Sequence, residues 1–331
     1  MDESLASTIR EQLLNLLYEH EGEFISGQKM SEMLHCSRTA IWKHIEELRK
    51  EGFELEAVQK KGYRIVSKPD QLTEHEIKFN LKTKRFGQTV HSFDSITSTQ
   101  EVAKQLAFEG AKEGTIVVAE EQTKGRGRMN RPWDSKKTGG IYFSLILKPK
   151  IAIQEAPQLT LLSAVGIVRG IKRVTGLNCQ IKWPNDVLIN GKKLVGILTE
   201  LQAEADQIHS VIIGIGINVN QKSFPKELEN IATSLYQQMN KKVERTALLQ
   251  AILLELEELY EDYLEHGFAV VKMLWETYAV SIGKKIKAHT LHGTIEGIAK
   301  GITDAGVLLL EDESGKVHQI YSADIEIAST K

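Results

Sequence analysis

Residues 115–133 read TIVVAEEQTKGRGRMNRPW, an apolar strand-like run followed by a segment with three arginines and two glycines. A second apolar run, GGIYFSLIL at 139–147, follows closely. One or two lysines are enough to keep a surface loop in water, so this concentration of arginine indicates an anionic ligand. In an extended chain Arg126 and Arg128 point the same way because they occupy alternate positions, and Arg131 follows within reach.

The length and composition are those of a globular protein. The chain has 331 residues, of which 41% are hydrophobic and 26% charged, and its formal net charge is −2. This length predicts about two domains, and the composition excludes disordered and fibrous classes. Because the chain is not basic as a whole, any nucleic-acid binding must come from a local positive patch.

Two features bear on the compartment. Cys36 and Cys179 are the two cysteines and lie outside any CxxC pattern, which argues against a zinc site or a disulfide framework. The N-terminus, MDESLAS, lacks the basic start and apolar core of a signal peptide, and no apolar run approaches the roughly 18 residues that span a bilayer. We therefore expect a cytoplasmic protein with no membrane partner.

The first 66 residues carry the signals of three helices. Ser7 precedes apolar residues at helical spacing, and Ser26 and Ser37 can cap a second and a third helix. The third helix is predicted to end at Gly52 and to bury one apolar face, formed by Ile41, Ile45 and Leu48. Two helices joined by so short a turn are typical of the helix-turn-helix, whose second helix lies in the DNA major groove.

The segment after the third helix predicts a wing. FELEAVQKKGYRIV at 53–66 alternates apolar and polar positions around a basic tip, which is typical of a hairpin. Together the elements predict a winged helix-turn-helix. On the third helix, Arg38, Thr39, Trp42 and Lys43 are expected to face the groove of operator DNA or its rim. In the hairpin, Lys60, Lys61 and Arg64 are expected to contact phosphates.

A protein-interaction module is the alternative for this segment, since its acidic residues outnumber its basic ones. DNA binding is favoured because the positive side chains gather on the third helix and the hairpin tip. A single module with so little charge binds weakly, so we expect a homodimer that reads two half-sites.

From about residue 90 to 220, strand-like runs alternate with one long helical stretch at 156–174, which predicts a mixed α/β or α+β domain. Polar stretches lie where these runs end, so their side chains can converge on one site. They are SITSTQ at 95–100, QTKGRGRMNRPW at 122–133, KWPND at 182–186, and GKKL and GIGINVN, interpreted as turns near 191 and 214.

The chemistry of these stretches is that of an anion site. A P-loop and a GxGxxG motif between strand and helix are both missing, so neither common nucleotide-binding fold applies. Arginine forks with Lys182 and Lys193 suit phosphate or carboxylate, and Asp186 can hold Mg²⁺ through oxygen. Gly125 and Gly127 allow the arginine-rich loop to close over a ligand.

Four motifs, in this order and spacing, resemble the biotin protein ligase family: QTKGRGRMNRPW, KWPNDV, GKKLVGILTE and GIGINVN. With the winged helix before them, the chain is similar to the bifunctional bacterial members, which are also biotin operon repressors. The resemblance covers the chain essentially end to end. Each motif alone is weak, but the four together are specific.

The resemblance implies a two-step reaction, that of a biotin–[acetyl-CoA-carboxylase] ligase. The biotin carboxylate attacks the α-phosphate of ATP to give biotinyl-5′-AMP and pyrophosphate, and a lysine of a biotin carboxyl carrier protein then attacks the mixed anhydride. The substrates are ATP and biotin, with Mg²⁺. The adenylate that stays bound is implied to act as corepressor.

The resemblance also implies the site residues. The catalytic residues are Arg128, Lys182 and Lys193. The biotin contacts are Ser98, Thr99, Gln100, Gln122, Gly125, Arg126, Gly127, Arg128, Trp133 and Lys193. The ATP or adenylate contacts are Arg128, Arg131, Lys182, Asn185, Asn218 and Phe224, and the metal ligand is Asp186.

Purely structural roles compete with some of these assignments. Ser98 and Thr99 can cap a helix that starts at Gln100, and Trp183 is favoured for the core. The family usually has asparagine at the position of Gln100 and glycine at that of Asn130, and the second departure bears on how the loop folds.

The lysine pair at 192 and 193 raises a choice of direction. Asn190 and Gly191 favour a tight turn that leaves one lysine outward and one inward. The family places its lysine before the leucine that follows, which makes Lys193 the inward one.

The C-terminal part predicts a loop and helix at 223–238, a long helix at 246–268 with one apolar face, and short strands from Ile286 to Ile327. The strands predict a small β-barrel, SH3-like by the resemblance. The predicted fold is therefore α+β and multidomain. Its parts are a winged helix-turn-helix at 1–66, a linker at 67–73, a class II synthetase-like mixed α/β ligase domain at 74–280 and an SH3-like domain at 281–331.

Three rival functions stay open on the sequence. The first is a repressor that senses a small anion without catalysis, against which Asp186 and two inward lysines count. The second is a lipoate or octanoate ligase. The third is a ligase whose winged helix is vestigial or contacts protein.

Overall fold

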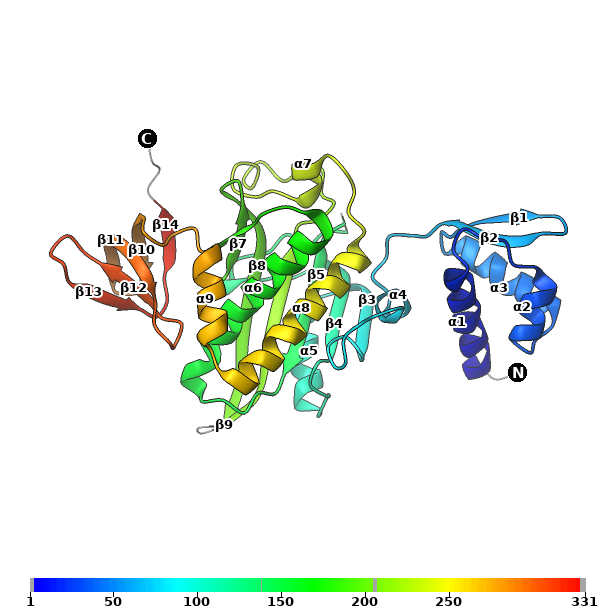
Figure 1. Cartoon of the computed structure of the whole chain (residues 1–331), viewed down its shortest axis with the longest axis horizontal. Helices are drawn as coiled ribbons and strands as arrows, with labels where there is room; N and C mark the ends of the chain where they lie inside the picture. Colours follow the sequence, from blue (N-terminus) through cyan, green and yellow to red (C-terminus); the bar gives the residue numbers. More distant parts are fainter. Residues whose placement is uncertain (1–2, 138, 205–206, 328–331) are drawn as a thin grey trace. The chain divides into compact units, whose positions relative to one another are not determined.

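The structure is a computed structural model that describes residues 3–137, 139–204 and 207–327 (Figure 1). The chain divides into two compact units, Met1–Gln71 and Leu72–Lys331. Residues 328–331 of the predicted C-terminal domain lie outside the described residues. In the described part, no helix combines the length and the apolar character needed to cross a membrane.

The first unit contains helices α1 (Glu3–Glu19), α2 (Gly27–Met33) and α3 (Arg38–Lys50) and strands β1 (Glu54–Val58) and β2 (Gly62–Ser67). Ser26 and Ser37 cap α2 and α3 as predicted, since each hydroxyl accepts a backbone N–H, from Lys29 and Ala40, at 3.1 Å. Helix α1 begins at Glu3, earlier than the helical pattern after Ser7 predicts.

The two strands of this unit form the predicted wing against the helices. The apolar face of α3, with Ile41, Ile45 and Leu48, is buried as expected. Ile25 exchanges two backbone hydrogen bonds with Tyr63, both at 2.9 Å. Gly62 has φ +110°, and a Cβ there would lie 1.9 Å from the Ile25 carbonyl oxygen. Only glycine lets the wing approach this closely, so the layout is a winged helix-turn-helix.

The second unit is built on a seven-stranded sheet in the order β3-β4-β5-β9-β8-β7-β6. The β3/β4 pair is parallel and the other neighbours are antiparallel. The strands are β3 (Val90–Ile96), β4 (Ile116–Gln122), β5 (Ile141–Leu147), β6 (Gln180–Lys182), β7 (Asp186–Ile189), β8 (Lys192–Glu204) and β9 (Gln207–Ile217). Strand β3 was not predicted, because this edge strand is mostly exposed and polar in its middle.

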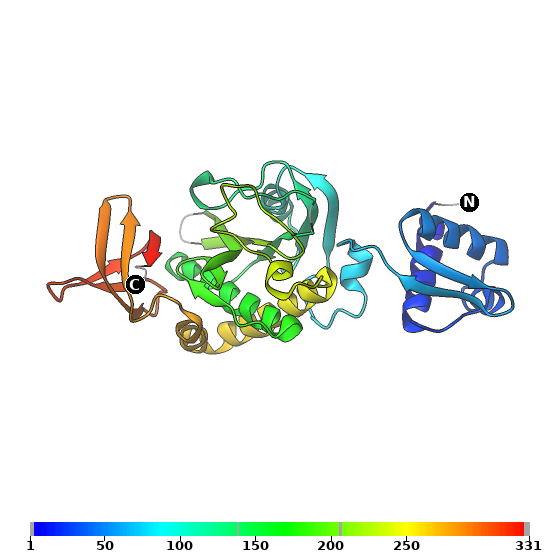
Figure 2. The ribbon, with the colours of Figure 1, turned by 90° about the horizontal axis from the view of Figure 1, so that it is seen from above.

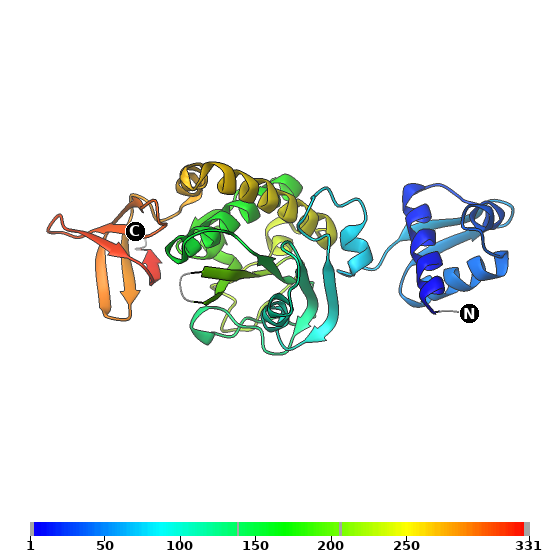
Figure 3. The same cartoon turned by 90° about the horizontal axis from the view of Figure 1, so that it is seen from below.

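Helices cover both faces of this sheet (Figures 2 and 3). Helices α6 (Ala156–Thr175), α8 (Arg245–His266) and α9 (Ala269–Tyr278) lie on one face, and α5 (Thr99–Phe108) lies on the other. Strand β5 shows the division, since Phe143 and Leu145 belong to the main core while Ile146 packs with the apolar side of α5. The short helices α4 (Glu74–Lys78) and α7 (Leu235–Met239) complete the domain.

The C-terminal strands form an antiparallel sheet in the order β13-β12-β11-β10-β14. They are β10 (Lys285–Thr290), β11 (Gly293–Ile302), β12 (Leu308–Glu311), β13 (Val317–Ile320) and β14 (Asp324–Ile327). Within the described residues no ladder joins β13 to β14, so the predicted barrel is not closed. The inner face continues the main core, and Trp183, which is 3% exposed, donates its indole N–H to the Gly306 carbonyl at 3.2 Å. The predicted core role of Trp183 is confirmed.

The buried carboxylate of Glu257 on α8 leads to a stability prediction. It is 3% exposed and accepts the backbone N–H groups of Lys84, Arg85 and Phe86 at 2.6, 2.8 and 2.7 Å. Glu257→Ala should lower the free energy of unfolding by about 3 kcal/mol, because these donors lose their acceptor. The exposed neighbour Glu258 gives the control, since Glu258→Ala should stay within about 0.5 kcal/mol of the parent in urea denaturation. Equal stability of the two variants would contradict the assignment.

Candidate functional site

Three glycines on β8 and β9 leave a trough on the sheet face that α5 covers. Gly196 and Gly216 stand opposite each other in the β8/β9 ladder. A Cβ would lie 2.8 Å from the Trp133 ring at Gly196, 2.3 Å from its Nε1 at Gly216, and 2.5 Å from the Gln100 Oε1 at Gly214. The two side chains therefore lie directly on the strands. The predicted turn near 214 is wrong, because both glycines of GIGI lie inside β9 and serve close packing.

The arginine-rich segment forms a small hairpin beside this trough. Gly127 donates its N–H to the Arg131 carbonyl at 2.8 Å, and the tip contains Met129 and Asn130 with φ of 55° and 56°. Asparagine is among the residues that tolerate this left-handed conformation. The departure at Asn130 is therefore compatible with a turn that glycine would also make.

The arginines of the hairpin contact different elements. Arg126 pairs with Glu101 on α5 and, at 3.3 Å, with Glu200 on β8. Arg128 instead donates to Ser322 Oγ at 2.8 Å. The expectation that Arg126 and Arg128 point the same way is not met, because the chain leaves the extended conformation at the hairpin tip.

Arg128 is more buried than Arg131. Besides Ser322 it contacts Asn185 Oδ1 at 3.3 Å and the Ala323 carbonyl at 3.4 Å. Burial lowers the pKa of its guanidinium, while Asp324 and Asp186 act in the opposite direction. Arg131 pairs with Asp324. Two arginines of the hairpin thus engage the β13–β14 segment of the C-terminal domain.

Lys193 faces the trough and Lys192 does not. Lys193 Nζ lies 2.6 Å from Asp186 Oδ1 and 5.4 Å from the centroid of the Trp133 ring. Lys192 Nζ donates to the Glu229 carbonyl at 2.9 Å. The tight turn between β7 and β8 gives the two lysines opposite directions, in agreement with the predicted orientation.

Asp186 is the predicted metal ligand. Among the described residues, no group of three or more His, Cys, Asp or Glu side chains is placed to hold a metal ion. One oxygen of Asp186 is already neutralised by Lys193. This donor set suits Mg²⁺ only if phosphate oxygens and water complete the coordination, which is how Mg²⁺ is commonly held with nucleotides.

A buried polar chain lines the start of α5. Thr99 donates its backbone N–H to Gln122 Oε1 at 2.8 Å, and Gln122 Nε2 donates to Ser135 Oγ at 2.9 Å. Ser98 is the N-cap residue of α5, but its side chain makes no capping hydrogen bond. The capping alternative therefore fails for Ser98, and its hydroxyl remains available to a ligand.

Both ends of the Gln100 amide are hydrogen-bonded within the protein. Its Nε2 donates to the Ile212 carbonyl at 3.0 Å, its Oε1 accepts from Ser144 Oγ at 2.9 Å, and the side chain is 3% exposed. Ser135 and Ser144 were missed on the sequence. Ser144 carries a signal in hindsight, since it is the one small residue of the otherwise bulky strand IYFSLIL.

The predicted nucleotide residues are only partly brought together. Asn185 holds Arg128 and donates its Nδ2 to the Ile197 carbonyl at 2.7 Å. Asn218 is 5% exposed at the end of β9, and Phe224 lies half-buried in the loop that follows. Lys182 has no carboxylate within ion-pair distance in the described part of the chain, so its charge is available to an anion.

The predicted DNA contacts lie mainly on exposed positions of the first unit. Those with exposed side chains on α3 and the wing tip are Arg38, Thr39, Trp42, Lys43, Lys60 and Lys61. Arg64 differs, because it pairs with Glu56 and its guanidinium lies 4.6 Å from the centroid of the Phe24 ring. Its charge is already compensated within the wing.

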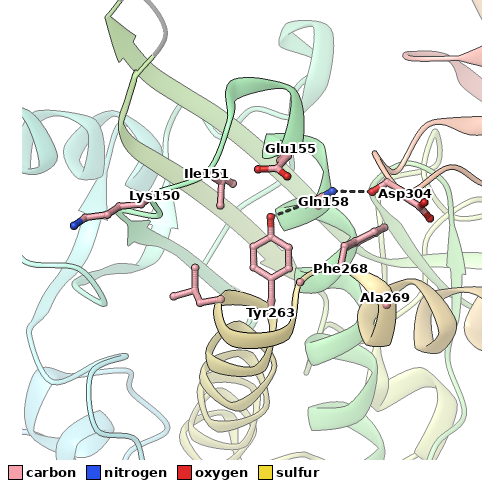
Figure 4. A pocket seen from close by; sticks show the side chains of 10 residues that line it. Lys150, Ile151, Glu155, Gln158, Tyr263, Phe268, Ala269 and Asp304 are labelled. Atoms are coloured by element: carbon pink, nitrogen blue, oxygen red, sulfur yellow. Dashed lines mark hydrogen bonds between the residues drawn. The ribbon is translucent and has the colours of Figure 1, made fainter.

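A separate cavity of about 430 Å³ lies between the ends of α6 and α8 and the C-terminal sheet (Figure 4). It contains none of the predicted site residues. Tyr263 donates to Gln158 Oε1 at 2.5 Å and Gln158 donates to the Asp304 carbonyl at 2.7 Å, so the amide is satisfied within the protein. Burial raises the pKa of Tyr263 to about 12. Tyr263 and Gln158 therefore contribute to packing between the domain of the seven-stranded sheet and the C-terminal sheet.

Comparison with known families matches three parts of the chain. Residues 92–218 match the biotin/lipoate A/B protein ligase family, residues 9–64 an HTH domain, and residues 281–327 the biotin protein ligase C terminal domain.

Individual relatives extend the similarity to the whole chain. It is 56% identical to the bifunctional ligase/repressor BirA of Bacillus subtilis, over 98% of this chain and 100% of that protein. Identity to the protein of that name from Escherichia coli is 30%, over 94% and 95% of the two chains. The biotin protein ligase from Aquifex aeolicus, solved in complex with biotin and ATP, superimposes with a TM-score of 0.64 at 32% identity, covering 73% of this chain and 100% of that one. The resemblance inferred from the four motifs is confirmed, and the chain belongs to the biotin protein ligase family.

Proposed function

We propose that this protein is a biotin–[biotin carboxyl carrier protein] ligase that also represses transcription of biotin synthesis genes. It forms biotinyl-5′-AMP from biotin and ATP, transfers biotin to a lysine of the carrier, and uses the bound adenylate as corepressor. One observation carries the proposal beyond the family relationship. The ammonium of Lys193 lies over the Trp133 ring, which rests on the paired Gly196 and Gly216. This arrangement suits a ligand that has an apolar ring and a side chain ending in a carboxylate.

The first step joins two anions, so the site must offset their repulsion. Lys193 is assigned to the biotin carboxylate and the later acyl phosphate, and Arg128 and Lys182 to the phosphates of ATP. Preorganised positive groups aimed at developing charge contribute a few kcal/mol each. To reach a phosphate, Arg128 exchanges its present neutral acceptors, Ser322 and Asn185.

The remaining residues bind and orient. The ureido ring of biotin is assigned to Ser98, Thr99 and Gln122, with Gly125, Arg126 and Gly127 closing over it. The adenylate is assigned to Arg131, Asn185, Asn218 and Phe224. Asp186 would supply one oxygen to Mg²⁺ that arrives with ATP, and the ion would screen the phosphates.

No residue of this chain acts as a covalent nucleophile in the proposal, because the attacking amine belongs to the carrier. Burial raises the pKa of the Cys179 thiol to about 12, so it stays protonated and inert. Catalysis then consists of positioning and electrostatic stabilisation.

The regulatory part concerns the winged helix-turn-helix at 1–66, followed by a linker at 67–73, a catalytic domain at 74–280 and a C-terminal domain at 281–331. We infer a homodimer that binds operator DNA in the cytoplasm. Free Cys36 and Cys179 support a reducing compartment, and the adenylate favours the dimer if it orders the loops around it.

The neighbouring lysines offer a matched test of catalysis. Lys193→Ala should lower kcat for biotin-dependent pyrophosphate release about 100-fold, because the carboxylate and acyl phosphate lose their cation. Lys192→Ala should stay within about twofold, since that side chain points outward. Pyrophosphate release and transfer of labelled biotin to a carrier domain measure both steps. A wild-type chain that binds biotin without releasing pyrophosphate would be a sensor, and equal turnover of lipoate would indicate the rival ligase.

The trough gives a second prediction. Gly216→Ala should raise KM for biotin about tenfold, because the new methyl group displaces the Trp133 indole. Gly27→Ala is the control, since a Cβ there meets only Tyr63 at 3.7 Å. Initial rates at varied biotin measure the effect, and an unchanged KM in Gly216→Ala would remove Trp133 from the biotin site.

A third prediction concerns DNA. In the presence of biotin and ATP, Arg38→Ala and Lys43→Ala should each weaken operator binding and reduce the salt slope of log K by about one, as expected for a lost phosphate contact. Ligase activity should not change. Lys50→Ala, an exposed change in the last turn of the same helix, serves as control in fluorescence anisotropy titrations. Unchanged binding by Arg38→Ala and Lys43→Ala would favour a vestigial or protein-binding wing.

A further inference from the structure

Gln100 and Ser144 form a buried pair where α5 meets the sheet. The exposed fractions of their side chains are 3% and 0%. Ser144 stands opposite Gly214 in the β5/β9 ladder, and a Cβ at Gly214 would lie 2.5 Å from Gln100 Oε1. The glycine thus leaves the space that the Gln100 amide fills.

The hydrogen-bond directions of this pair follow from obligatory donors and acceptors. Gln100 Nε2 lies 3.0 Å from the Ile212 carbonyl on β9 and 3.4 Å from the Leu198 carbonyl on β8. Carbonyl oxygens only accept, so this end of the amide is the donor and Oε1 must accept. The partner of Oε1 is Ser144 Oγ at 2.9 Å, and the single proton of Ser144 is committed there.

The direction of the Ser144 hydrogen bond also fixes that of the Thr99 hydroxyl. Ser144 Oγ lies 2.9 Å from Thr99 Oγ and, with its proton already used, can only accept from it. The other neighbour, Gln122 Oε1 at 3.1 Å, is also an acceptor, because it takes the backbone N–H of Thr99 at 2.8 Å. The hydroxyl proton of Thr99 therefore stays inside the protein, and the lone pairs of its oxygen suit an N–H donor of the ligand.

We propose that Gln100 and Ser144 are positioning residues for the biotin site. By tying α5 to the carbonyls of β8 and β9, they hold Ser98 and Thr99 in place and direct Thr99 to accept an N–H, such as that of a cyclic urea. Gln100 itself does not touch the ligand, in contrast to its predicted role as a biotin contact. The inference rests on the proposed ligase function.

The length of Gln100 allows a direct test. Gln100→Asn introduces the residue usual in the family into a site where Gly214 and Ser144 fit glutamine. The side chain is one methylene shorter and cannot keep its bonds to both strands and Ser144. KM for biotin should rise about tenfold, while kcat and KM for ATP stay within about twofold. Ser144→Ala should act in the same direction. Its effect should not add to that of Gln100→Asn, because both remove one network.

Gln158 provides the matched control. It is 5% exposed, both ends of its amide are hydrogen-bonded, and it lies on α6 beside the C-terminal domain. Gln158→Asn should leave the kinetic constants for biotin unchanged. If Gln100→Asn raises KM for biotin and ATP alike, or behaves as Gln158→Asn does, the positioning role is overturned.

A measurement without catalysis separates this inference from the ligase function. Hydrogen exchange of the full-length chain should show faster exchange in the first turn of α5 for Gln100→Asn, but not for Gln158→Asn. Unchanged exchange there would overturn the inference even in an active enzyme. Failure of biotin to raise the Tm of the wild-type chain would instead overturn the proposed function, and the ligand assignment with it.

Discussion

The site depends on the close approach of Trp133 to the sheet. An indole can lie on two strands only where both lack a side chain, and the pairing of β8 with β9 places Gly196 opposite Gly216 at that point. A Cβ at Gly216 would lie 2.3 Å from the indole Nε1, so any other residue there would force the ring to move. The Lys193 ammonium lies over the Trp133 ring. Its position therefore depends on the absence of side chains at Gly196 and Gly216.

Compensation of charge is the second constraint. A pocket that must accept two anions needs several cations, and unpaired cations in partly buried positions are costly. The structure pairs Arg126 with Glu200, Lys193 with Asp186 and Arg131 with Asp324. In each pair the carboxylate offsets the charge of the cation, and an anionic ligand can compete for that cation. Arg128 is held by neutral acceptors, so a phosphate gains it without leaving a carboxylate unpaired.

The sequence predicted what depends on local pattern. The caps at Ser26 and Ser37, the wing, the long helices and most strands follow from periodicity and turn residues. Strand β3 is not predicted by this pattern, because an exposed edge strand needs no alternation of apolar and polar residues. The glycines of β9 also match a turn pattern, since glycine is common to turns and to close packing and only the facing side chain distinguishes the two. The direction of Arg126 and the inward role of Gln100 depend on partners far away in sequence, which a local pattern does not contain.

One face of the sheet carries the apolar core and the other carries the candidate site. This difference explains why the helices of the core were easier to predict than the geometry of the site. The face under α6 and α8 carries the continuous apolar core, whose helical periodicity is strong in the sequence. On the other face α5 covers only a small apolar cluster, and the space beside it is filled by the polar chain from Gln100 to Ser135. Polar side chains that bond to one another leave no periodic signature, because each is placed by a partner rather than by water. A binding site built this way is identified by motif composition, while its geometry follows only from the fold.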